Sequence, residues 1–104
     1  MKIGQVPFAC VKLAEADLKD RAAVYAILCV KDNGEWNLVD VGQSAEVDAK
    51  IDAHPRHSEW KMNCPTGKLW VGVYSMPTAS YKKEDRISME HKLRKLYNPP
   101  CCQR

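Results

Sequence analysis

Glu90 has the clearest capacity for chemistry, because the sequence places its carboxylate beside the apolar side of a predicted helix. Residues 84–97 are rich in strong helix formers, and at about 100° per residue Glu90 projects next to Tyr97, at the border of the apolar arc. A carboxylate there needs a partner, since burying an unpaired charge is costly. Two interpretations remain open: an ion pair with Arg86 or Arg94 along the helix, and ligation of a metal ion.

Tyr25 and Asp40 are brought together by a predicted hairpin. Residues 22–30 form an unbroken apolar run, too short to cross a bilayer, which predicts a central strand buried on both faces. Asp32-Asn33-Gly34 follows, and its Asn-Gly pair predicts a tight turn in which both residues take positive φ. The chain then returns antiparallel through residues 36–41, so Tyr25 and Asp40 lie on neighbouring strands.

Lys50, His54 and Arg56 follow the hairpin and add two cations and an imidazole. Residues 44–54 predict a helix that begins at a serine cap and ends at a proline, with His54 on its apolar face. Residues 56–68 are polar and predict a loop. A histidine at a helix end belongs more often to the edge of a core than to an acid–base pair, and both roles stay open for His54.

The remaining elements and the composition describe an ordinary globular chain. Residues 69–76 predict a third strand, and residues 1–21 predict a lead-in, irregular or with a short helical turn, to one domain spanning residues 1–104. The chain is 45% hydrophobic and 28% charged, and its formal charge of +3 gives only weak support for an anionic partner. We expect neither a secretory signal nor a membrane partner.

Five cysteines without a Cys-X-X-Cys pair favour reduced thiols and therefore a cytoplasmic location. Cys101 and Cys102 are expected on an exposed tail. A zinc site that combines them with Cys64 and two histidines is an alternative, but no ligand pair has the spacing of a zinc finger.

In order and spacing, these features resemble the GIY-YIG nuclease superfamily over about residues 22–102. The matching segments are Ala23-Val24-Tyr25 for its first tripeptide, Asp40-Val41-Gly42 with Gln43-Ser44 for its second, Lys50 and His54 for an arginine and a histidine, Arg86-Ile87-Ser88-Met89-Glu90 for its glutamate helix, and Tyr97-Asn98-Pro99-Pro100-Cys101-Cys102 for its terminal motif. Each motif alone is short, and their combined order makes the match fairly specific.

The resemblance implies an α/β fold of the α+β type, with a small, mainly antiparallel, three-stranded central sheet flanked by helices. It also implies cleavage of DNA phosphodiesters with one divalent metal ion, Mg²⁺ or Mn²⁺, held by Glu90. Tyr25 would orient or deprotonate the attacking water, and Lys50 would occupy the position of the arginine that neutralises charge on the phosphate.

Three positions depart from the family pattern. Asp40 stands where a second tyrosine is usual, Lys50 lacks the planar fork of an arginine, and Cys102 replaces an asparagine. Two substitutes are open: Arg56 for the missing guanidinium, and Asp40 as a second metal ligand or a base.

We therefore expect a GIY-YIG-like domain with a partly degenerate site, which binds nucleic acid, DNA above all, through Lys50, Arg56 and Arg86 with weak or no cleavage. One alternative is an active metal-dependent endonuclease that uses Tyr25, Lys50 and Glu90. Another is a protein-interaction module that retains only the fold. The chain has no room for a separate targeting domain, so a protein partner would supply specificity.

Overall fold

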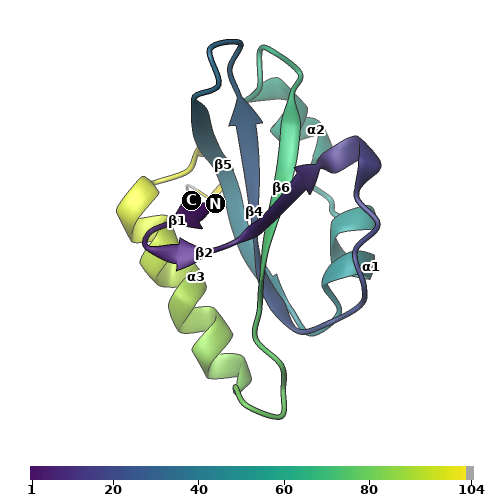
Figure 1. The fold of residues 1–104 in the computed structure, drawn as a ribbon, viewed down its shortest axis with the longest axis vertical. Coiled ribbons are helices and arrows are strands. Elements are labelled where there is room, and N and C mark those ends of the chain that lie inside the picture. The colour runs from purple at the N-terminus through teal and green to yellow at the C-terminus, as the bar shows by residue number, and fades with distance from the viewer. Residues whose placement is uncertain (103–104) are drawn as a thin grey trace.

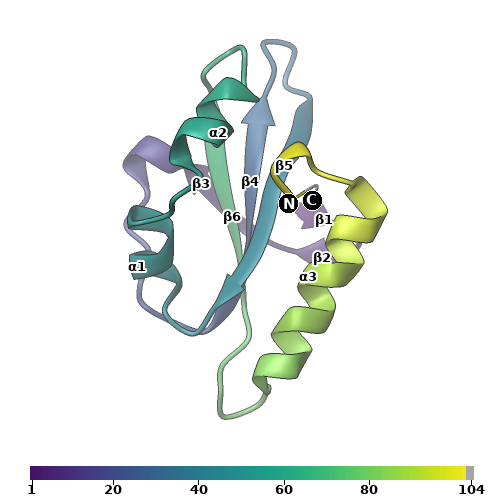
Figure 2. The ribbon, with the colours of Figure 1, turned by 180° about the vertical axis from the view of Figure 1, so that it is seen from behind.

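The centre of the fold is an antiparallel sheet of four strands in the order β3-β6-β4-β5. The computed structural model describes residues 1–102, shown from opposite sides in Figures 1 and 2. In chain order the elements are β1 (Lys2–Ile3), β2 (Val6–Pro7), β3 (Ala9–Lys12), η1 (Leu13–Glu15), β4 (Ala23–Val30), β5 (Trp36–Ser44), α1 (Val47–Asp52), α2 (His57–Met62), β6 (Leu69–Ser75), α3 (Lys83–Tyr97) and η2 (Pro100–Cys102). The α+β class predicted from the sequence is confirmed.

β4 is the central strand that the apolar run predicts. All but the last of its residues are buried, and it pairs with β5 on one side and β6 on the other. The turn into β5 differs from the prediction, because within Asp32-Asn33-Gly34 only Gly34 has a positive φ, of 88°. These residues form a three-residue loop closed by the N–H of Lys31, which donates to the carbonyl of Glu35 at 2.7 Å, and such loops need a left-handed residue only at their last position.

The prediction of a three-stranded sheet is wrong, because β3 joins it as a fourth strand. β3 pairs antiparallel with β6, and three of its four residues are exposed. An edge strand with little buried surface has a weak apolar pattern, so residues 9–12 could be recognised only from their pairing with β6.

α2 is also absent from the sequence prediction, which assigned residues 56–68 to a loop. Its only buried residue is Trp60, so the helix has no repeating apolar pattern that a sequence could reveal. The helix predicted over residues 44–54 is present but shorter, as α1, and buries Val47 and Ile51. α1 and α2 cover one face of the sheet, whereas α3 runs along the β5 side (Figure 2).

α3 confirms the predicted helix and lies beside β5, where its apolar side joins the cluster on the face of the sheet opposite α1 and α2. Leu93 is fully buried in the apolar cluster of that face, whereas Leu96 is 60% exposed. The N–H of Gly4, in the β1–β2 turn, donates to the Tyr97 hydroxyl at 2.8 Å near the end of α3. Within residues 1–102, no helix combines the length and apolar character needed to span a membrane.

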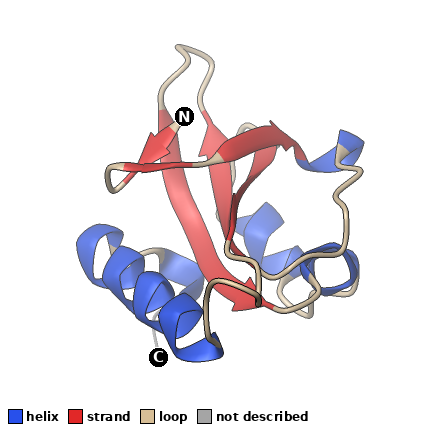
Figure 3. Cartoon of the chain, turned by 60° about the horizontal axis from the view of Figure 1, so that its bottom comes forward, coloured by secondary structure: helices blue, strands red, loops and turns tan. Residues whose placement is uncertain are grey.

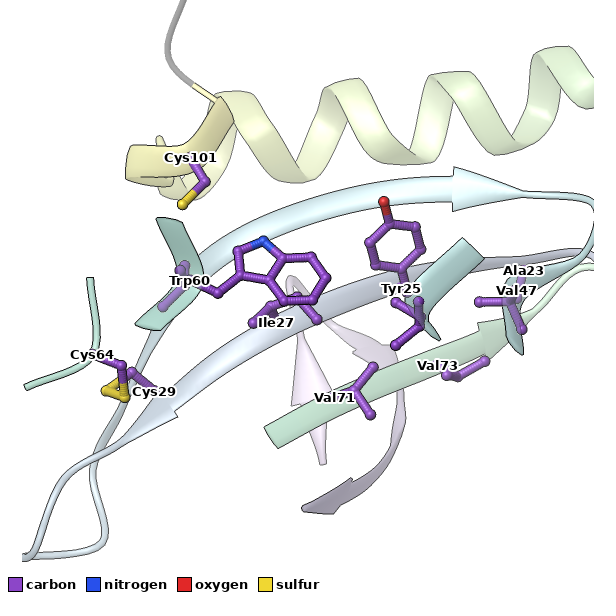
Figure 4. Packing of buried hydrophobic residues seen from close by; sticks show 12 residues of the cluster. Ala23, Tyr25, Ile27, Cys29, Val47, Trp60, Cys64, Val71, Val73 and Cys101 are labelled. Carbon is purple, nitrogen blue, oxygen red and sulfur yellow. A yellow bond between two sulfur atoms is a disulfide. The ribbon is translucent and has the colours of Figure 1, made fainter. Parts of the chain in front are cut away.

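A disulfide joins Cys29 of β4 to Cys64, just after α2, with both residues buried (Figure 4). The expectation that all thiols are reduced is therefore wrong. The two cysteines are separated by 35 positions and carry no spacing motif, so the sequence could not pair them. The cytoplasmic location stays a prediction without the argument that supported it. Cys64 is also removed from the zinc alternative, because its sulfur has no thiolate to offer.

Candidate active site

A hollow of about 250 Å³ lies between α1 and the start of α2 on one side and α3 on the other. Its floor is formed by β4 and β5, which bring the hairpin residues to the same place (Figure 3 shows the helices flanking the end of β5). Its lining residues are Tyr25, Gly42, Gln43, Lys50, His54, Pro55, Arg56, Glu90 and Arg94. Four elements and the loop between α1 and α2 thus supply one set of charged and hydrogen-bonding groups.

Tyr25 stands on the floor of the hollow because its strand partner is a glycine. Tyr25 and Gly42 are paired in the β4–β5 register, and a Cβ atom on residue 42 would collide with the Tyr25 hydroxyl and ring. Figure 4 shows the Tyr25 ring rising from β4 with its oxygen directed toward β5. Gly42 therefore makes room for the phenol to cross the neighbouring strand.

His54 holds the Tyr25 hydroxyl with one nitrogen and the start of α2 with the other. Its Nε2 lies 2.7 Å from the Tyr25 oxygen, and its Nδ1 accepts the backbone N–H of Arg56 at 3.1 Å. Burial lowers the pKa of His54 to about 4, with a further contribution from the charge of Arg56, so the ring is neutral at pH 7. Because Nδ1 accepts, the single ring proton is on Nε2 and is donated to Tyr25. His54 thus orients the phenol and does not take its proton.

Asp40 holds Arg56 in position from beneath the hollow. The side chain of Asp40 is fully buried; its Oδ2 accepts the Arg56 Nε–H at 2.9 Å and the Trp60 indole N–H at 2.7 Å, while Oδ1 accepts the N–H of Val41 at 2.8 Å. Together with a longer contact from Arg56 Nη2 to Oδ1 at 3.5 Å, donors from three residues satisfy the charge of the carboxylate inside the protein. The contacts of Asp40 are therefore those of a residue that positions a guanidinium, and Asp40 does not line the hollow.

Lys50 lies in the last turn of α1, exposed to solvent at the rim of the hollow. Lys50, on α1, and Arg56, at the start of α2, line the same side of the hollow. The predicted substitution of Arg56 for the family arginine stays open, because Arg56 lines the hollow while its Nε–H is bound to Asp40.

Glu90 reaches the hollow from α3 and is bound there by Arg94. The Arg94 Nη2 lies 2.6 Å from Glu90 Oε1, and only 9% of Glu90 is exposed. Burial raises the pKa of the Glu90 carboxyl, although Arg94 acts in the opposite direction. The ion-pair interpretation of Glu90 is therefore realised, and the same pair also lines the candidate site.

Two arginines of α3 have donors that no described residue accepts. Arg86 is buried and donates its Nε–H to the Gln43 side-chain oxygen at 3.0 Å, but its Nη1 has no hydrogen-bond partner within residues 1–102. The Nε of Arg94 is likewise buried without a partner there. Arg86 does not line the hollow but contacts Gln43, which does, and its contact with nucleic acid stays a prediction.

The hollow favours anions over cations. Three cationic side chains and one carboxylate line it, and Asp40 compensates part of the charge from behind. Among the described residues, no three His, Cys, Asp or Glu side chains gather closely enough to hold a metal ion. Glu90 alone fits a hard cation of the Mg²⁺ type, which keeps several waters and binds through one carboxylate together with substrate phosphate.

Comparison of the chain with protein-family models, with curated proteins and with solved structures finds no match. Of the residues that the sequence predicts for the site, five line the hollow: Tyr25, Lys50, His54, Arg56 and Glu90. The other two, Asp40 and Arg86, do not line it.

Two residues that line the site, Arg94 and Gln43, are not predicted as site residues by the sequence. The sequence predicts Arg94 only as an ion-pair partner for Glu90, because an i,i+4 Glu–Arg spacing is equally typical of a pair on an exposed helix surface. Gln43 gave no signal beyond the family motif.

Cys101, expected on an exposed tail, is buried on the sheet face near Trp60 (Figure 4). The side chain of Cys102 lies outside the described residues.

Proposed function

We propose that the hollow binds a phosphodiester of nucleic acid, in the manner expected of a GIY-YIG-like domain. The observation that carries this proposal is the convergence of Lys50, Arg56 and Arg94, from three separate segments, on one small hollow that also contains Tyr25 and Glu90. A single phosphate carries a charge and oxygen acceptors that such a set of donors satisfies.

Arg94 supplies the guanidinium that the sequence resemblance loses at Lys50. A guanidinium binds two phosphate oxygens at once, and the unpartnered buried Nε of Arg94 is one such donor. A phosphate on Arg94 would compete with Glu90 for the same Nη2, because the present contact is an ion pair of 2.6 Å. Binding would then free the Glu90 carboxylate within the occupied site.

The direct test is the affinity of the chain for fluorescent DNA strands as a function of salt. We expect the logarithm of the binding constant to fall with the logarithm of salt by about 0.9 per phosphate contact on a duplex, or about 0.7 on a single strand. Lys50→Ala and Arg94→Ala should each weaken binding and reduce this slope by about one contact.

Lys95→Ala is the matched control, because Lys95 is exposed on the same helix and does not line the hollow. Equal losses in the Lys95 and Arg94 variants would contradict binding at the hollow. Binding that does not depend on salt, or no binding at all, would leave the protein-interaction alternative.

Metal-dependent cleavage is the second candidate, favoured by the presence of Glu90 and Tyr25 in the same hollow. A divalent cation on Glu90 would polarise a phosphoryl oxygen and stabilise the leaving oxygen. His54 fixes the phenol of Tyr25 by donating to it, so the hydroxyl proton of Tyr25 is directed away from the imidazole. Lys50 and Arg56 would neutralise charge on the phosphate.

Cleavage is tested with labelled duplex and single-stranded DNA in Mg²⁺ or Mn²⁺. Nicking should be slow, and Glu90→Gln should abolish it. Glu84→Gln, an exposed carboxylate at the start of α3, should leave it unchanged. Nicking that survives Glu90→Gln would exclude the site, and its absence in the unmodified chain would leave phosphate binding alone.

A further inference from the structure

A second and larger hollow lies outside the candidate active site, between the outer edge of β5 and the end of α3. It encloses about 550 Å³. Its lining residues are Trp36, Asn37, Leu38, Val39, Asn63, Tyr97, Asn98 and Pro100. Nothing in the proposed function uses these residues.

The walls of this second hollow combine side-chain amides with aromatic rings. Asn37 is exposed on β5, and Asn98 ends α3 in a left-handed conformation with φ 48°. The Nδ2 of Asn63 donates to the carbonyl of Glu59 at 2.8 Å and faces Cys101 Sγ at 3.6 Å, so the atom Asn63 offers to a ligand is its carbonyl oxygen. The exposed Asn37 amide presents a donor and an acceptor side by side, which is the pattern on the edge of a nucleobase, and the Asn63 oxygen adds an acceptor.

The aromatic wall consists of Trp36 and Tyr97. Their ring centroids are 5.9 Å apart and their planes are inclined at 45°, so the two rings form a wedge. Tyr97 is 37% exposed, and its hydroxyl is tied to the N–H of Gly4. An aromatic face fixed in this way is suited to stacking against a flat ring.

The second hollow and the candidate active site are separate cavities that take residues from the same two parts of the fold, β5 and the C-terminal end of α3. α3 supplies Arg94 to one and Asn98 to the other, and the N–H of Asn98 donates to the carbonyl of Arg94 at 2.7 Å. Along β5, Val39 and Gly42 are three residues apart, or about 10 Å in an extended strand. A stacked nucleic-acid strand crosses this distance in about three nucleotides at ~3.4 Å each.

We infer that the second hollow binds an unpaired nucleobase of the strand whose phosphate occupies the candidate active site. The inference rests on the proposed function and specifies its ligand as single-stranded or splayed nucleic acid. The ligand is an unpaired base, because in a base pair the hydrogen-bonding edge that the amides would contact is already occupied by the other base.

Anisotropy titrations with two strands of equal length test it: an ordinary DNA strand of about 12 nucleotides, and an abasic sugar–phosphate strand with the same number of phosphates. The unmodified chain should bind the base-bearing strand about 10-fold or more tightly than the abasic strand. Trp36→Leu and Asn37→Ala should weaken binding of the base-bearing strand about 5- to 100-fold and leave the abasic strand unaffected.

Trp70→Leu is the matched control, because Trp70 is a second partly buried tryptophan packed against the same apolar cluster and lies outside the hollow. Asn37→Ala tests the same hollow without the risk that the Trp36 variant fails to fold, because Asn37 is exposed and its side chain can be shortened without disturbing the core.

Each outcome separates this inference from the proposed function. Equal, salt-dependent binding of both strands would overturn the base pocket and leave phosphate binding intact. Equal losses for both strands in the Asn37 variant would also overturn it. If neither strand binds, both proposals are overturned.

Discussion

The two walls of the candidate active site are built in different ways. On the wall formed by α1 and α2, Arg56 and His54 are committed to partners within the protein, and Asp40 receives donors from three residues without exposure to solvent. On the α3 wall, Glu90 and Arg94 are bound to each other, and Arg94 retains a buried Nε–H without a partner in the described chain.

The difference separates groups that are held in place from groups that can exchange partners. Truncating one member of a buried, fully bonded set leaves its partners unsatisfied, so the first wall carries stability. The Glu90–Arg94 pair is a single contact, and 30% of the Arg94 side chain is exposed, so Arg94 can exchange Glu90 for a ligand at lower cost than Arg56 can exchange the fully buried Asp40.

Asp40→Ala, on the α1–α2 wall, should cause the largest loss of unfolding free energy among the variants of the two walls. It leaves the Arg56 guanidinium and the Trp60 indole N–H without their acceptor in a buried position, which typically costs about 3–5 kcal/mol of unfolding free energy. Urea unfolding measures this loss. Asp52→Ala, an exposed acid on α1, is the control and should change stability by less than about 0.5 kcal/mol. A similar loss in both variants would refute the structural role of Asp40.

A second test uses the pH dependence of stability. The pKa of His54 is about 4 in the folded chain and about 6.5 when exposed, so between these values the unfolded state binds more protons. The contribution of His54 is complete above pH 6.5 and is lost as the pH falls toward 4, by at most about 3 kcal/mol. The unmodified chain should therefore lose more stability over this range than His54→Gln.

His91→Gln, at an exposed position of α3, serves as the control for the loss of a histidine as such. It should follow the unmodified chain over the whole range. Proton NMR of the His54 ring gives the same answer directly, and titration near pH 6.5 would show that the ring is not buried as described.

The smallest effect is expected on the α3 wall. Glu90→Gln should lower the free energy of unfolding by about 1 kcal/mol at pH 7, less than Asp40→Ala, because the loss of the ion pair with Arg94 is offset by removal of the burial penalty on a carboxylate whose pKa is raised, and the glutamine still fills the site. Chemical denaturation compares it with Asp40→Ala under the same conditions. A loss as large as that of the Asp40 variant would mean that both walls are structural.

Elements with a local signal were predictable from the sequence. The apolar run of β4, the Asn-Gly loop and the helix-forming composition of α3 each depend on neighbouring residues. The proximity of Tyr25 and Glu90 does not follow from these local signals and was implied only by the family resemblance; both residues line the hollow. Elements defined by distant contacts were not predictable. α2 depends on one buried tryptophan, and β3 depends on its pairing with β6.

The same distinction applies within the site. The chemistry expected of Asp40 was inferred from its residue type, whereas its burial depends on Arg56 and Trp60, which lie in and beside a helix that the sequence did not reveal. Arg94 shows the converse, because its pairing with Glu90 was anticipated and its position in the hollow was not.

The link between Cys29 and Cys64 closes a covalent ring that contains β5, α1 and α2, and leaves α3 outside it. In the chain-entropy picture, a ring of this length restricts the unfolded chain by about 4 kcal/mol. A partial opening that detaches α3 would therefore leave Lys50 and Arg56 inside the ring, while Glu90 and Arg94 move away with α3. Recovery of the site from that state would require only that α3 dock again.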